Sequence, residues 1–462
     1  MKLVMKFGGT SMAGAEKIRH AASLALAQAA QHEVVCVVSA MDGVTEQLLE
    51  LAAAAGHGNR SAMLAVLAEI RTAHERAAKE LGCVSEMEAA LVKLETLASG
   101  IGAIGELTPR SNDAVVAFGE RLSTLLMGKA MNCPALDGAQ AGIVTNDHFT
   151  SADPLMELSL FQVRQKLGVL LAPGKPVVVS GFIAANQHGV TTTLGRGGSD
   201  YTATILGAAI KADEIWIWSD VDGMMTADPR VVPTAKLLSA ISFAEAVEMG
   251  KFGAKSMHPR ALEPAAEHHI PVRMRNTFKP DNPGTLIGAQ TRLAGSDAGS
   301  TTKREVTAVP ALKNMAIITV GGATMIGRPG TAAAIFDALA LARVNVHMIC
   351  QSVSESGISI AVSAAQCDLA RGALERAINA ALGEKTARAI DTQTGVSIVA
   401  PVGDGMKGTP GIAARVFTAI ARSGINVIAI AQGSSERSIA LAVMDKDGPE
   451  AVRALHSEFG LG

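Results

Sequence analysis

The sequence predicts an α/β fold in which helices cover both faces of a mostly parallel sheet, followed by two small modules of order βαββαβ. Two observations support this prediction. Short apolar runs alternate with long helical stretches over residues 1–288, and a segment that begins at Pro329 is repeated from Pro410. Aromatic residues make up only 3% of the chain against 48% hydrophobic residues, so the layers must pack mainly through aliphatic side chains.

The elements of the first part follow from the spacing of apolar residues. Four apolar or β-branched runs, each followed closely by Gly, Ser or Asp, predict buried strands at Leu3–Phe7, Val34–Ser39, Pro176–Ser180 and Ile215–Trp218. Helical periodicity predicts helices over Ala15–Ala30, Val44–Ala55, Ser61–Leu81 and Ala114–Met131. Ligands of such folds bind beyond the carboxyl ends of the strands, so residues just after each strand are the first candidates for a site.

A polar segment divides the chain. Residues 289–304 are small, polar and charged without an amphipathic period, which predicts a linker. Beyond it, Pro329–Val362 aligns without gaps on Pro410–Val443, so we expect two homologous modules. The predicted domains are a large one at 1–288 and two ferredoxin-like modules at 305–390 and 391–462.

Composition and charge argue against several classes of function. The formal net charge is −2 and no basic run is present, so nucleic acid is not an expected partner. No apolar stretch approaches the roughly 20 residues that cross a bilayer, and the amino terminus lacks the apolar core of a secretory signal. We expect a cytoplasmic protein with reduced cysteines and without a membrane partner. The adjacent His268 and His269 would point in different directions on a helix, so no protein metal site is expected.

The first candidate site is Lys6–Ser11 (KFGGTS), at the end of the first predicted strand. Gly8 and Gly9 let backbone amides approach an anion, and the following helix presents its positive amino end. Lys6 adds a full positive charge, so the candidate phosphate contacts are Gly8, Gly9, Thr10 and Ser11. The spacing of a Walker loop is absent, and taken alone the segment is better explained as an ordinary glycine turn.

The second candidate, TTTLGRGGSDYTA at Thr191–Ala203, holds more glycines and charges than a turn requires. Arg196 can form a bidentate pair with a substrate carboxylate. Asp200 either orients Lys6 or contacts a metal. Gly197 and Gly198 are further candidates for phosphate binding, and Ser199 is a candidate for substrate binding. A third segment, Trp218–Arg230, carries three aspartates after a buried strand, for which a solvated turn is a competing explanation.

Together these segments resemble the ordered motifs of the aspartate kinases. The matching segments are KFGGTS at 6–11, SAMDGVT at 39–45, FGE at 118–120, GRGGSD at 195–200, DVDG with DPR at 220–230, and EMGKFGAKSMHP at 248–259. The resemblance covers residues 2–287, and the downstream repeat resembles paired ACT domains. It implies the amino acid kinase fold and the ATP-dependent phosphorylation of the L-aspartate β-carboxylate to 4-phospho-L-aspartate, the first step toward lysine, threonine and methionine.

The resemblance also implies roles for single residues. Lys6, with Asp200, would act in catalysis by stabilising the transferring phosphoryl group. Similar enzymes hold the amino acid through residues that match Ser39, Thr45, Glu120 and Arg196, where Arg196 suits the α-carboxylate and Glu120 the α-ammonium. They bind the nucleotide through residues that match Ser219, Asp220, Met225, Arg230 and Lys255.

Two chemical expectations accompany these roles. The aspartate β-carboxylate is already ionised at neutral pH, so no strong base is required. Met225 stands where relatives usually carry an aromatic residue, so an altered affinity for the nucleotide is expected. Mg²⁺ is expected with ATP, held largely by phosphates and water.

The ACT resemblance implies that a small amino acid binds beneath the turn after the first strand of a module. Candidate effector contacts are Met325, Asn345, Gln351 and Asn426. Asparagines that simply form turns are an equally good explanation for Asn345 and for Asn426. We expect feedback inhibition by lysine, threonine or both, and a homodimer or larger homo-oligomer formed through the ACT domains. The sequence leaves open which module the strand near Glu305–Pro310 joins.

Two alternative functions compete with this interpretation. Another amino acid kinase, such as a glutamate kinase, shares the phosphate motifs, but FGE, SAMDGVT and the tandem ACT modules favour aspartate. A catalytically dead amino acid sensor would be expected to lack Lys6, Arg196, Asp200 or Lys255, and all four are present.

Overall fold

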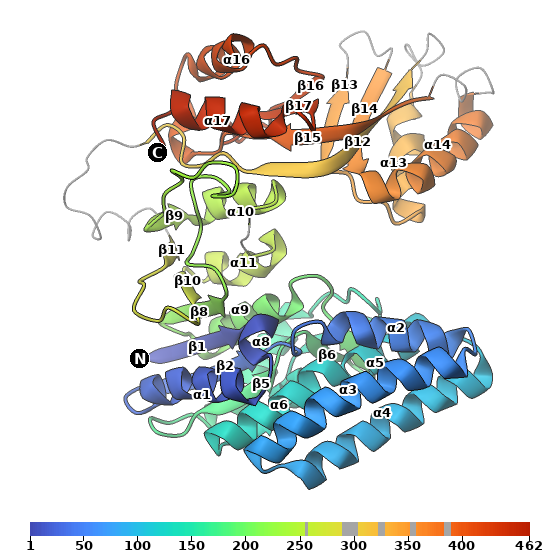
Figure 1. Cartoon of the computed structure of the whole chain (residues 1–462), viewed down its shortest axis with the longest axis vertical. Coiled ribbons are helices and arrows are strands. Elements are labelled where there is room, and N and C mark those ends of the chain that lie inside the picture. Colours follow the sequence, from blue (N-terminus) through green and yellow to red (C-terminus); the bar gives the residue numbers. More distant parts are fainter. Residues whose placement is uncertain (255–256, 289–303, 322–328, 352–356, 383–389) are drawn as a thin grey trace. The chain divides into compact units, whose positions relative to one another are not determined.

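The computed structural model describes residues 1–254, 257–288, 304–321, 329–351, 357–382 and 390–462 (Figure 1). These residues form two compact units, each with its own core. Unit 1 comprises the described residues of Met1–Met224, Leu238–Phe243 and Met257–Asp297. Unit 2 comprises those of Met225–Leu237, Ala244–Ser256 and Ala298–Gly462. The predicted linker at 289–304 lies almost wholly outside the described residues.

The main sheet of unit 1 is mostly parallel, as the sequence predicts. Its strand order is β3 (Ala135–Leu136), β5 (Val177–Ser180), β2 (Glu33–Val38), β1 (Lys2–Phe7), β8 (Glu214–Ser219), β10 (Val272–Asn276), β11 (Thr285–Gly288) and β9 (Ala240–Ser242). Strands β1, β2, β5, β8 and β10 run in one direction, and β11 pairs antiparallel with β10. The carboxyl ends of β1, β2, β8 and β10 therefore meet at one edge of the sheet, where ligands of such folds bind.

Helices cover both faces of this sheet. Leu3, Met5 and Phe7 point into a core shared with α1 (Ala15–Ala29) and α6 (Phe118–Met131), whereas α9 (Gly198–Ile210) packs on the other face. Further helices of unit 1 are α2 (Val44–Gly56), α3 (Arg60–Leu81), α4 (Val84–Ile104), α5 (Pro109–Val116), α7 (Gly138–Ala141), α8 (Met156–Gly168) and α11 (Pro259–Glu267). Figure 1 shows α3 and α4 running side by side. A small second sheet has the order β4 (Val144–Thr145), β6 (Ile183–Asn186) and β7 (Thr191–Thr193).

Unit 2 contains the sequence repeat as two copies of one pattern. The first copy is β12 (Ala311–Gly321), α13 (Thr331–Leu341), β13 (Met348–Gln351), β14 (Gly357–Ser363) and α14 (Cys367–Leu382). The second is β15 (Ile390–Val399), α16 (Ile412–Arg422), β16 (Ala429–Ala431), β17 (Ala440–Met444) and α17 (Gly448–Glu458). The repeat elements thus correspond as the ungapped alignment predicts.

Both copies share one sheet, in the order β13-β14-β12-β15-β17-β16. Residues just before β12 pair with the second copy, since Thr307 and Ala308 donate backbone hydrogen bonds to the Val402 carbonyl at 2.7 and 3.1 Å. The residues near Glu305–Pro310 therefore pair with the second copy of the repeat. Unit 2 also includes most of α10 (Phe243–Lys251).

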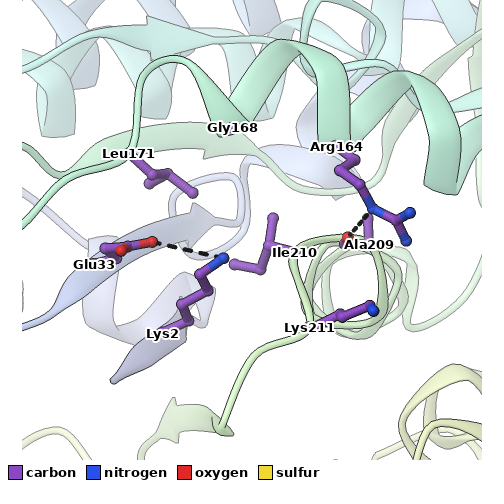
Figure 2. A pocket seen from close by; sticks show the side chains of 8 residues that line it. All are labelled: Lys2, Glu33, Arg164, Gly168, Leu171, Ala209, Ile210 and Lys211. Carbon is purple, nitrogen blue, oxygen red and sulfur yellow. Dashed lines mark hydrogen bonds and ion pairs between the residues drawn. The ribbon is translucent and has the colours of Figure 1, made fainter.

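A cavity of about 270 Å³ lies at the amino ends of β1 and β2, away from the edge where the candidate motifs meet (Figure 2). Two of its cationic side chains have partners within the protein. Lys2 lies 3.8 Å from Glu33, and the Arg164 Nε donates to the Ala209 carbonyl at 3.1 Å. The cavity contains no residue of the candidate motifs. Among the described residues, no helix is both long and apolar enough to cross a membrane.

Candidate active site

An ion pair stands at the carboxyl edge of the main sheet. Lys6 is the penultimate residue of β1 and only 9% exposed, and its Nζ lies 2.6 Å from the Asp200 carboxylate in the first turn of α9. The sequence KFGGTS and the sequence GRGGSD are therefore brought together, as the motif interpretation requires. The Asp200 carboxylate fixes the position of the buried Lys6 side chain.

The loop after β1 is shaped by close backbone contacts. The Gly8 amide donates to the Trp218 carbonyl at 3.0 Å, and a Cβ on Gly9 would stand 3.1 Å from the Ala40 carbonyl. Thr10 is half-buried in the short 3-10 helix Gly9–Met12, whereas Ser11 is fully buried with its hydroxyl 2.6 Å from that of Thr277. The Ser11 hydroxyl is therefore engaged within the protein.

Glu120 is a carboxyl group held in a buried position. It lies in the first turn of α6, is only 4% exposed, and its Oε2 has no hydrogen-bond partner among the described residues. Burial raises the pKa of Glu120 to about 8, although the Ala40 amide and the Lys6 charge oppose that rise. A buried carboxyl with an unused oxygen is suited to receive a cation.

The loop that carries Arg196 owes its path to glycines. Gly197 has φ of 72°, which glycine adopts without strain, and a Cβ there would stand 2.7 Å from the His258 Cβ. Gly181 allows Ser199 to approach, because a Cβ at Gly181 would stand 2.6 Å from the Ser199 hydroxyl. Arg196 itself is exposed. Ser39 and Thr45, the other substrate candidates, are half-buried between the end of β2 and the start of α2.

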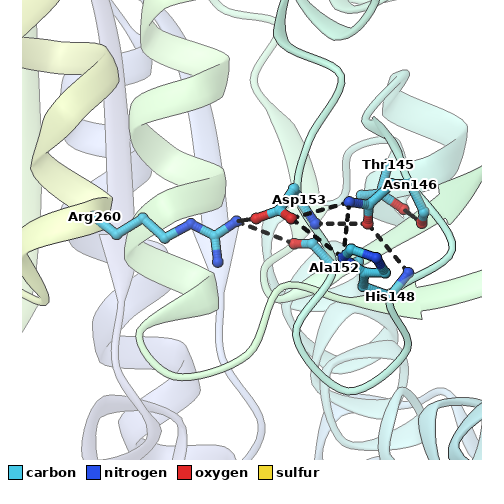
Figure 3. Close-up of polar contacts among 6 residues, drawn as sticks. All are labelled: Thr145, Asn146, His148, Ala152, Asp153 and Arg260. Atoms are coloured by element: carbon cyan, nitrogen blue, oxygen red, sulfur yellow. Dashed lines mark hydrogen bonds and ion pairs between the residues drawn. The ribbon is translucent and has the colours of Figure 1, made fainter. Parts of the chain in front are cut away.

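A network of hydrogen bonds fixes the segment that packs beside the Arg196 loop (Figure 3). Arg260 of α11 donates to the Asp153 carboxylate at 2.5 Å and to the Ala152 carbonyl at 3.3 Å, and its guanidinium lies 5.0 Å from the Tyr201 ring. The Asn146 side chain in turn donates to Asp153 at 3.0 Å and accepts from its backbone amide at 3.0 Å. The segment 146–153 is thereby fixed beside Gly195, where a Cβ would meet the Ser151 hydroxyl at 2.8 Å.

The nucleotide candidates fall in both units. Ser219 ends β8 and Asp220 follows it, both in unit 1. Met225 and Arg230 belong to unit 2, where the Arg230 guanidinium pairs with Asp228 at 2.7 Å. That pairing holds the pKa of Asp228 below its usual value. Lys255 lies outside the described residues.

The effector candidates that the structure describes are exposed. Asn345 and Asn426 precede β13 and β16 at equivalent places, and the Asn345 amide lies 3.2 Å from the His347 ring. Gln351 ends β13 and is also exposed. Met325 lies outside the described residues.

Several polar residues at the site were not singled out from sequence. Asp113 is fully buried and accepts hydrogen bonds from the backbone amides of Thr150 and Thr193. Asn276 ends β10 and Thr277 follows it, and both are buried. Strand β10 was not predicted, because its short VRMRN sequence carries two arginines and lacks the continuous apolar run of the predicted strands. The signal available was its position: polar residues directly after a parallel strand.

The side-chain donor atoms of the candidate residues Asp200, Ser219 and Asp220 are oxygens. Asp200, Ser219 and Asp220 lie at the ends of neighbouring elements, and oxygen donors suit a hard cation such as Mg²⁺. In the described part of the chain, no group of three or more His, Cys, Asp and Glu side chains is placed to hold a metal ion. Such a donor set fits a cation that arrives with phosphate ligands of its own.

Comparison with known proteins gives the family. The model described as "Amino acid kinase family" matches residues 1–276, and an ACT domain model matches 318–378 and 399–459. Aspartokinase 3 of Arabidopsis thaliana is 35% identical over 99% of this chain and 81% of the relative. The chain belongs to the aspartokinases of the amino acid kinase family. Other aspartokinase relatives are longer: the chain spans about half of the bifunctional aspartokinase/homoserine dehydrogenase 1 of Zea mays, with 35% identity over 99% of this chain.

Solved aspartokinase structures share the fold. Escherichia coli aspartokinase III, in a crystal structure with aspartate and ADP described as the R-state, matches with a TM-score of 0.81 and 30% identity. The same enzyme with lysine and aspartate, described as the T-state, matches with a TM-score of 0.78 and 29% identity. Both matches cover 99% of this chain and 99% of the other chain. The α/β fold with tandem ACT domains predicted from sequence is confirmed.

Proposed function

We propose that the chain transfers the γ-phosphoryl group of ATP to the β-carboxylate of L-aspartate, giving 4-phospho-L-aspartate and ADP. The observation that carries this proposal is the Lys6–Asp200 pair at the carboxyl edge, beside the buried Glu120. The aspartate and ADP named in the E. coli aspartokinase III structure support the same substrates.

The chain's residues would act by binding and charge neutralisation. A β-carboxylate oxygen forms the new bond to the γ-phosphorus while the bond to the β-phosphate oxygen breaks, and ADP takes the electron pair. Lys6 offsets the negative charge of the transferring group, and Asp200 fixes the position of Lys6. No proton needs to be removed from the nucleophile, because an aspartate carboxylate is ionised at neutral pH.

The amino acid would be oriented by opposite charges. The exposed Arg196 suits the α-carboxylate, and Glu120 suits the α-ammonium. The α-ammonium would donate a hydrogen bond to the Glu120 Oε2, which has no partner among the described residues. Ser39, Thr45 and Ser199 would complete the pocket. Gly8, Gly9, Gly197 and Gly198 would leave room for the phosphates.

Mg²⁺ is proposed as the companion of ATP. It would neutralise charge on the β- and γ-phosphates, with Asp200 or Asp220 as the oxygen ligands that this chain offers. Ser219, Met225, Arg230 and Lys255 remain the proposed nucleotide contacts.

The test is a coupled assay of ADP release with aspartate, glutamate or N-acetylglutamate as acceptor. We expect turnover with aspartate to exceed turnover with N-acetylglutamate by at least about 100-fold, because the acetyl group removes the α-ammonium charge that Glu120 would bind. Glutamate carries the same charges and is one methylene longer, so we expect aspartate to exceed it by about 10-fold or more. A reaction without acceptor gives the background of ATP hydrolysis. Release of ADP that does not depend on aspartate would contradict the proposal.

We also propose feedback inhibition by lysine, threonine or both at the ACT domains, near Met325, Asn345, Gln351 and Asn426. The lysine named in the second E. coli structure supports lysine. Titration calorimetry of the full chain with each amino acid tests this idea, and Asn345→Ala is expected to weaken the binding. Absence of binding of both amino acids, measured at two temperatures so that a binding enthalpy near zero is not mistaken for it, would contradict both effectors.

A homo-oligomer formed through the ACT domains is proposed as well. Ile349 of β13 and Ile430 of β16 are about half exposed, which favours burial against another copy. Light scattering of the full chain tests this, and a monomer at micromolar concentration would contradict it. The cytoplasmic location stays a prediction, because the plant relative is named as chloroplastic.

A further inference from the structure

The dipeptide Asn276-Thr277 stands where three neighbouring segments of unit 1 meet. Asn276 is the last residue of β10 and Thr277 follows it. Strand β10 pairs in parallel with β8, and β8 pairs in parallel with β1. Asn276 is 4% exposed and Thr277 is fully buried. We call Gly8–Ser11 the phosphate loop and Ser219–Asp222 the nucleotide loop, after the roles proposed above. These two residues lie in neither loop.

Thr277 is bonded to three segments. Its backbone amide donates to the Ser219 carbonyl at 2.9 Å, at the start of the nucleotide loop. Its hydroxyl lies 2.6 Å from the Ser11 hydroxyl, at the end of the phosphate loop. Its carbonyl lies 2.7 Å from the His20 Nε2 of α1. The hydroxyl pair links the residue after β10 directly to the phosphate loop, and both of its members are fully buried.

Asn276 engages the other end of the nucleotide loop. Its side-chain amide donates to the Asp222 carboxylate at 2.5 Å and, more weakly, to the Asp220 carbonyl at 3.4 Å. Its amide oxygen accepts from the Phe278 backbone at 2.8 Å, which fixes the direction of the amide group. The hydrogen bond from Asn276 lowers the pKa of Asp222, and the Lys279 Nζ adds to the effect from 3.0 Å.

We propose that Asn276 and Thr277 are positioning residues that hold the phosphate loop and the nucleotide loop at the separation which bound Mg-ATP requires. They would act through these loops and touch neither substrate. The contacts described for them reach the phosphate and nucleotide loops and α1, and none reaches Glu120 or Arg196. Their loss should therefore weaken nucleotide binding selectively. This inference rests on the proposed function as an ATP-dependent kinase.

The first test removes the hydroxyl of Thr277 without changing its shape. Thr277→Val leaves the buried Ser11 hydroxyl without its partner, and we expect the KM for ATP to rise about tenfold, the size of effect seen when a buried polar group loses its partner. The KM for aspartate should change less than twofold. Thr277→Ser keeps the hydroxyl and should restore the KM for ATP to within about threefold of the wild-type value. Thermal unfolding of both variants checks that they fold.

The second test uses charge and does not depend on the first. Asn276→Asp places a carboxylate against Asp222, and two close carboxylates repel each other unless one is protonated. We expect the KM for ATP to rise by at least about tenfold at pH 8 and to recover toward the wild-type value as pH falls to 6. Lys279→Gln is the matched control, because it removes the exposed partner of Asp222 and leaves Asn276 in place. Its KM for ATP should stay within about twofold.

The result that would overturn the proposal is an unchanged KM for ATP in Thr277→Val, or an equal rise in both KM values. A pH-independent defect in Asn276→Asp would also overturn it. Calorimetry with Mg-ADP separates this inference from the proposed function. If the wild type binds Mg-ADP without turning over aspartate, the proposed reaction fails, and a tenfold weaker Mg-ADP affinity of Thr277→Val still supports the positioning role. A wild type that binds no Mg-ADP would overturn both.

Discussion

Glu120 shows how one buried side chain prepares a site for its ligand. Its carboxyl group lost its hydration on folding, and the described residues give its Oε2 no partner. The resulting pKa of about 8 means that the group is mostly protonated at neutral pH while the site is empty. A substrate ammonium would stabilise the ionised form, so binding and proton release are coupled.

This coupling predicts a pH dependence of aspartate binding. Below the Glu120 pKa of about 8 a proton must leave before the ammonium binds, so the KM for aspartate should fall by up to roughly tenfold per unit as pH rises from 6 toward 8. Steady-state kinetics across this range at saturating ATP measures it. Glu120→Gln should raise the KM for aspartate and remove its pH dependence. A flat profile in the wild type would contradict the assignment.

The same group affects the stability of the unliganded protein. Its folded pKa is raised above the ordinary value of 4.5, so its contribution to stability is full below pH 4.5 and is lost as pH rises through about 8. We expect the urea midpoint of Glu120→Gln to decline less between pH 5 and pH 9 than that of the wild type. Equal slopes for the two proteins would contradict a raised pKa.

Lys6 carries the largest expected catalytic effect. Lys6→Ala removes the cation beside Asp200, and kcat should fall by at least about 100-fold, as on loss of one preorganised transition-state donor. Lys2→Ala changes a lysine near the amino end of the same strand, whose side chain is 45% exposed, and serves as the control with near wild-type kcat. Near-normal turnover by Lys6→Ala would refute the role of Lys6.

Helix α6 approaches the loop after β2 at a glycine. A Cβ on Gly119 would stand 2.8 Å from the Ala40 Cβ and 3.2 Å from the Leu48 Cδ1. Because the Ala40 amide also acts on Glu120, the close approach of this helix sets the position of the buried carboxyl. The glycine of the FGE motif therefore has a packing reason as well as a place in the motif.

Gly119→Ala should destabilise the protein by about 1–3 kcal/mol, because the added methyl group overpacks this contact. The matched control is Gly100→Ala in α4, where a Cβ meets nothing within 4 Å and replacement should stabilise the helix by up to about 1 kcal/mol. Denaturant unfolding measures both variants. Equal effects of the two substitutions would show that the contact at Ala40 is unimportant.

Buried strands and helices with a regular period were predictable from the sequence, and irregular elements were not. Strands β1, β2, β5 and β8 lie within a residue or two of their predicted bounds, because apolar runs followed by turn residues define such strands. The predicted helix 114–131 is interrupted at Ala117 between α5 and α6. Strand β10 was missed because Arg275 is covered by the indoles of its neighbour β8, a tertiary contact that hides its charge.

The boundary between the two compact units differs from the domain boundary that the order of the motifs predicts. Residues 225–237 contain the kinase motif DPR and residues 244–256 contain most of EMGKFGAKSMHP, but both ranges are part of the unit that contains the ACT repeat. Within unit 2, the Thr226 hydroxyl lies 2.9 Å from the His456 ring, and Glu245 accepts hydrogen bonds from Thr307 and from the Asp404 amide. Motif order could not show this, because these contacts join segments about 60 to 230 residues apart. The candidate contacts Met225 and Arg230 therefore share a compact body with the proposed effector sites.

The buried His456 leads us to expect that unit 2 loses stability in acid. Burial and the nearby Lys236 charge lower the pKa of His456, so the folded state keeps the ring neutral while the unfolded chain protonates it below about pH 6.5. Stability should thus fall as pH drops through 6.5 toward 5, and His456→Gln should show a smaller decline. Exposed His188→Gln is the control and should follow the wild type. Thermal unfolding at several pH values measures all three.

The chain's two tryptophans, Trp216 and Trp218, stand together on β8. Trp218 stacks on Phe7 with ring centroids 6.1 Å apart, its carbonyl accepts from Gly8, and the Arg275 guanidinium lies within 4.7 Å of both indoles. Tryptophan fluorescence therefore arises only from the main sheet, beside the phosphate loop, while the ACT repeat emits none of it. A change of this emission on adding lysine or threonine would be an optical record of an effector signal reaching the catalytic sheet.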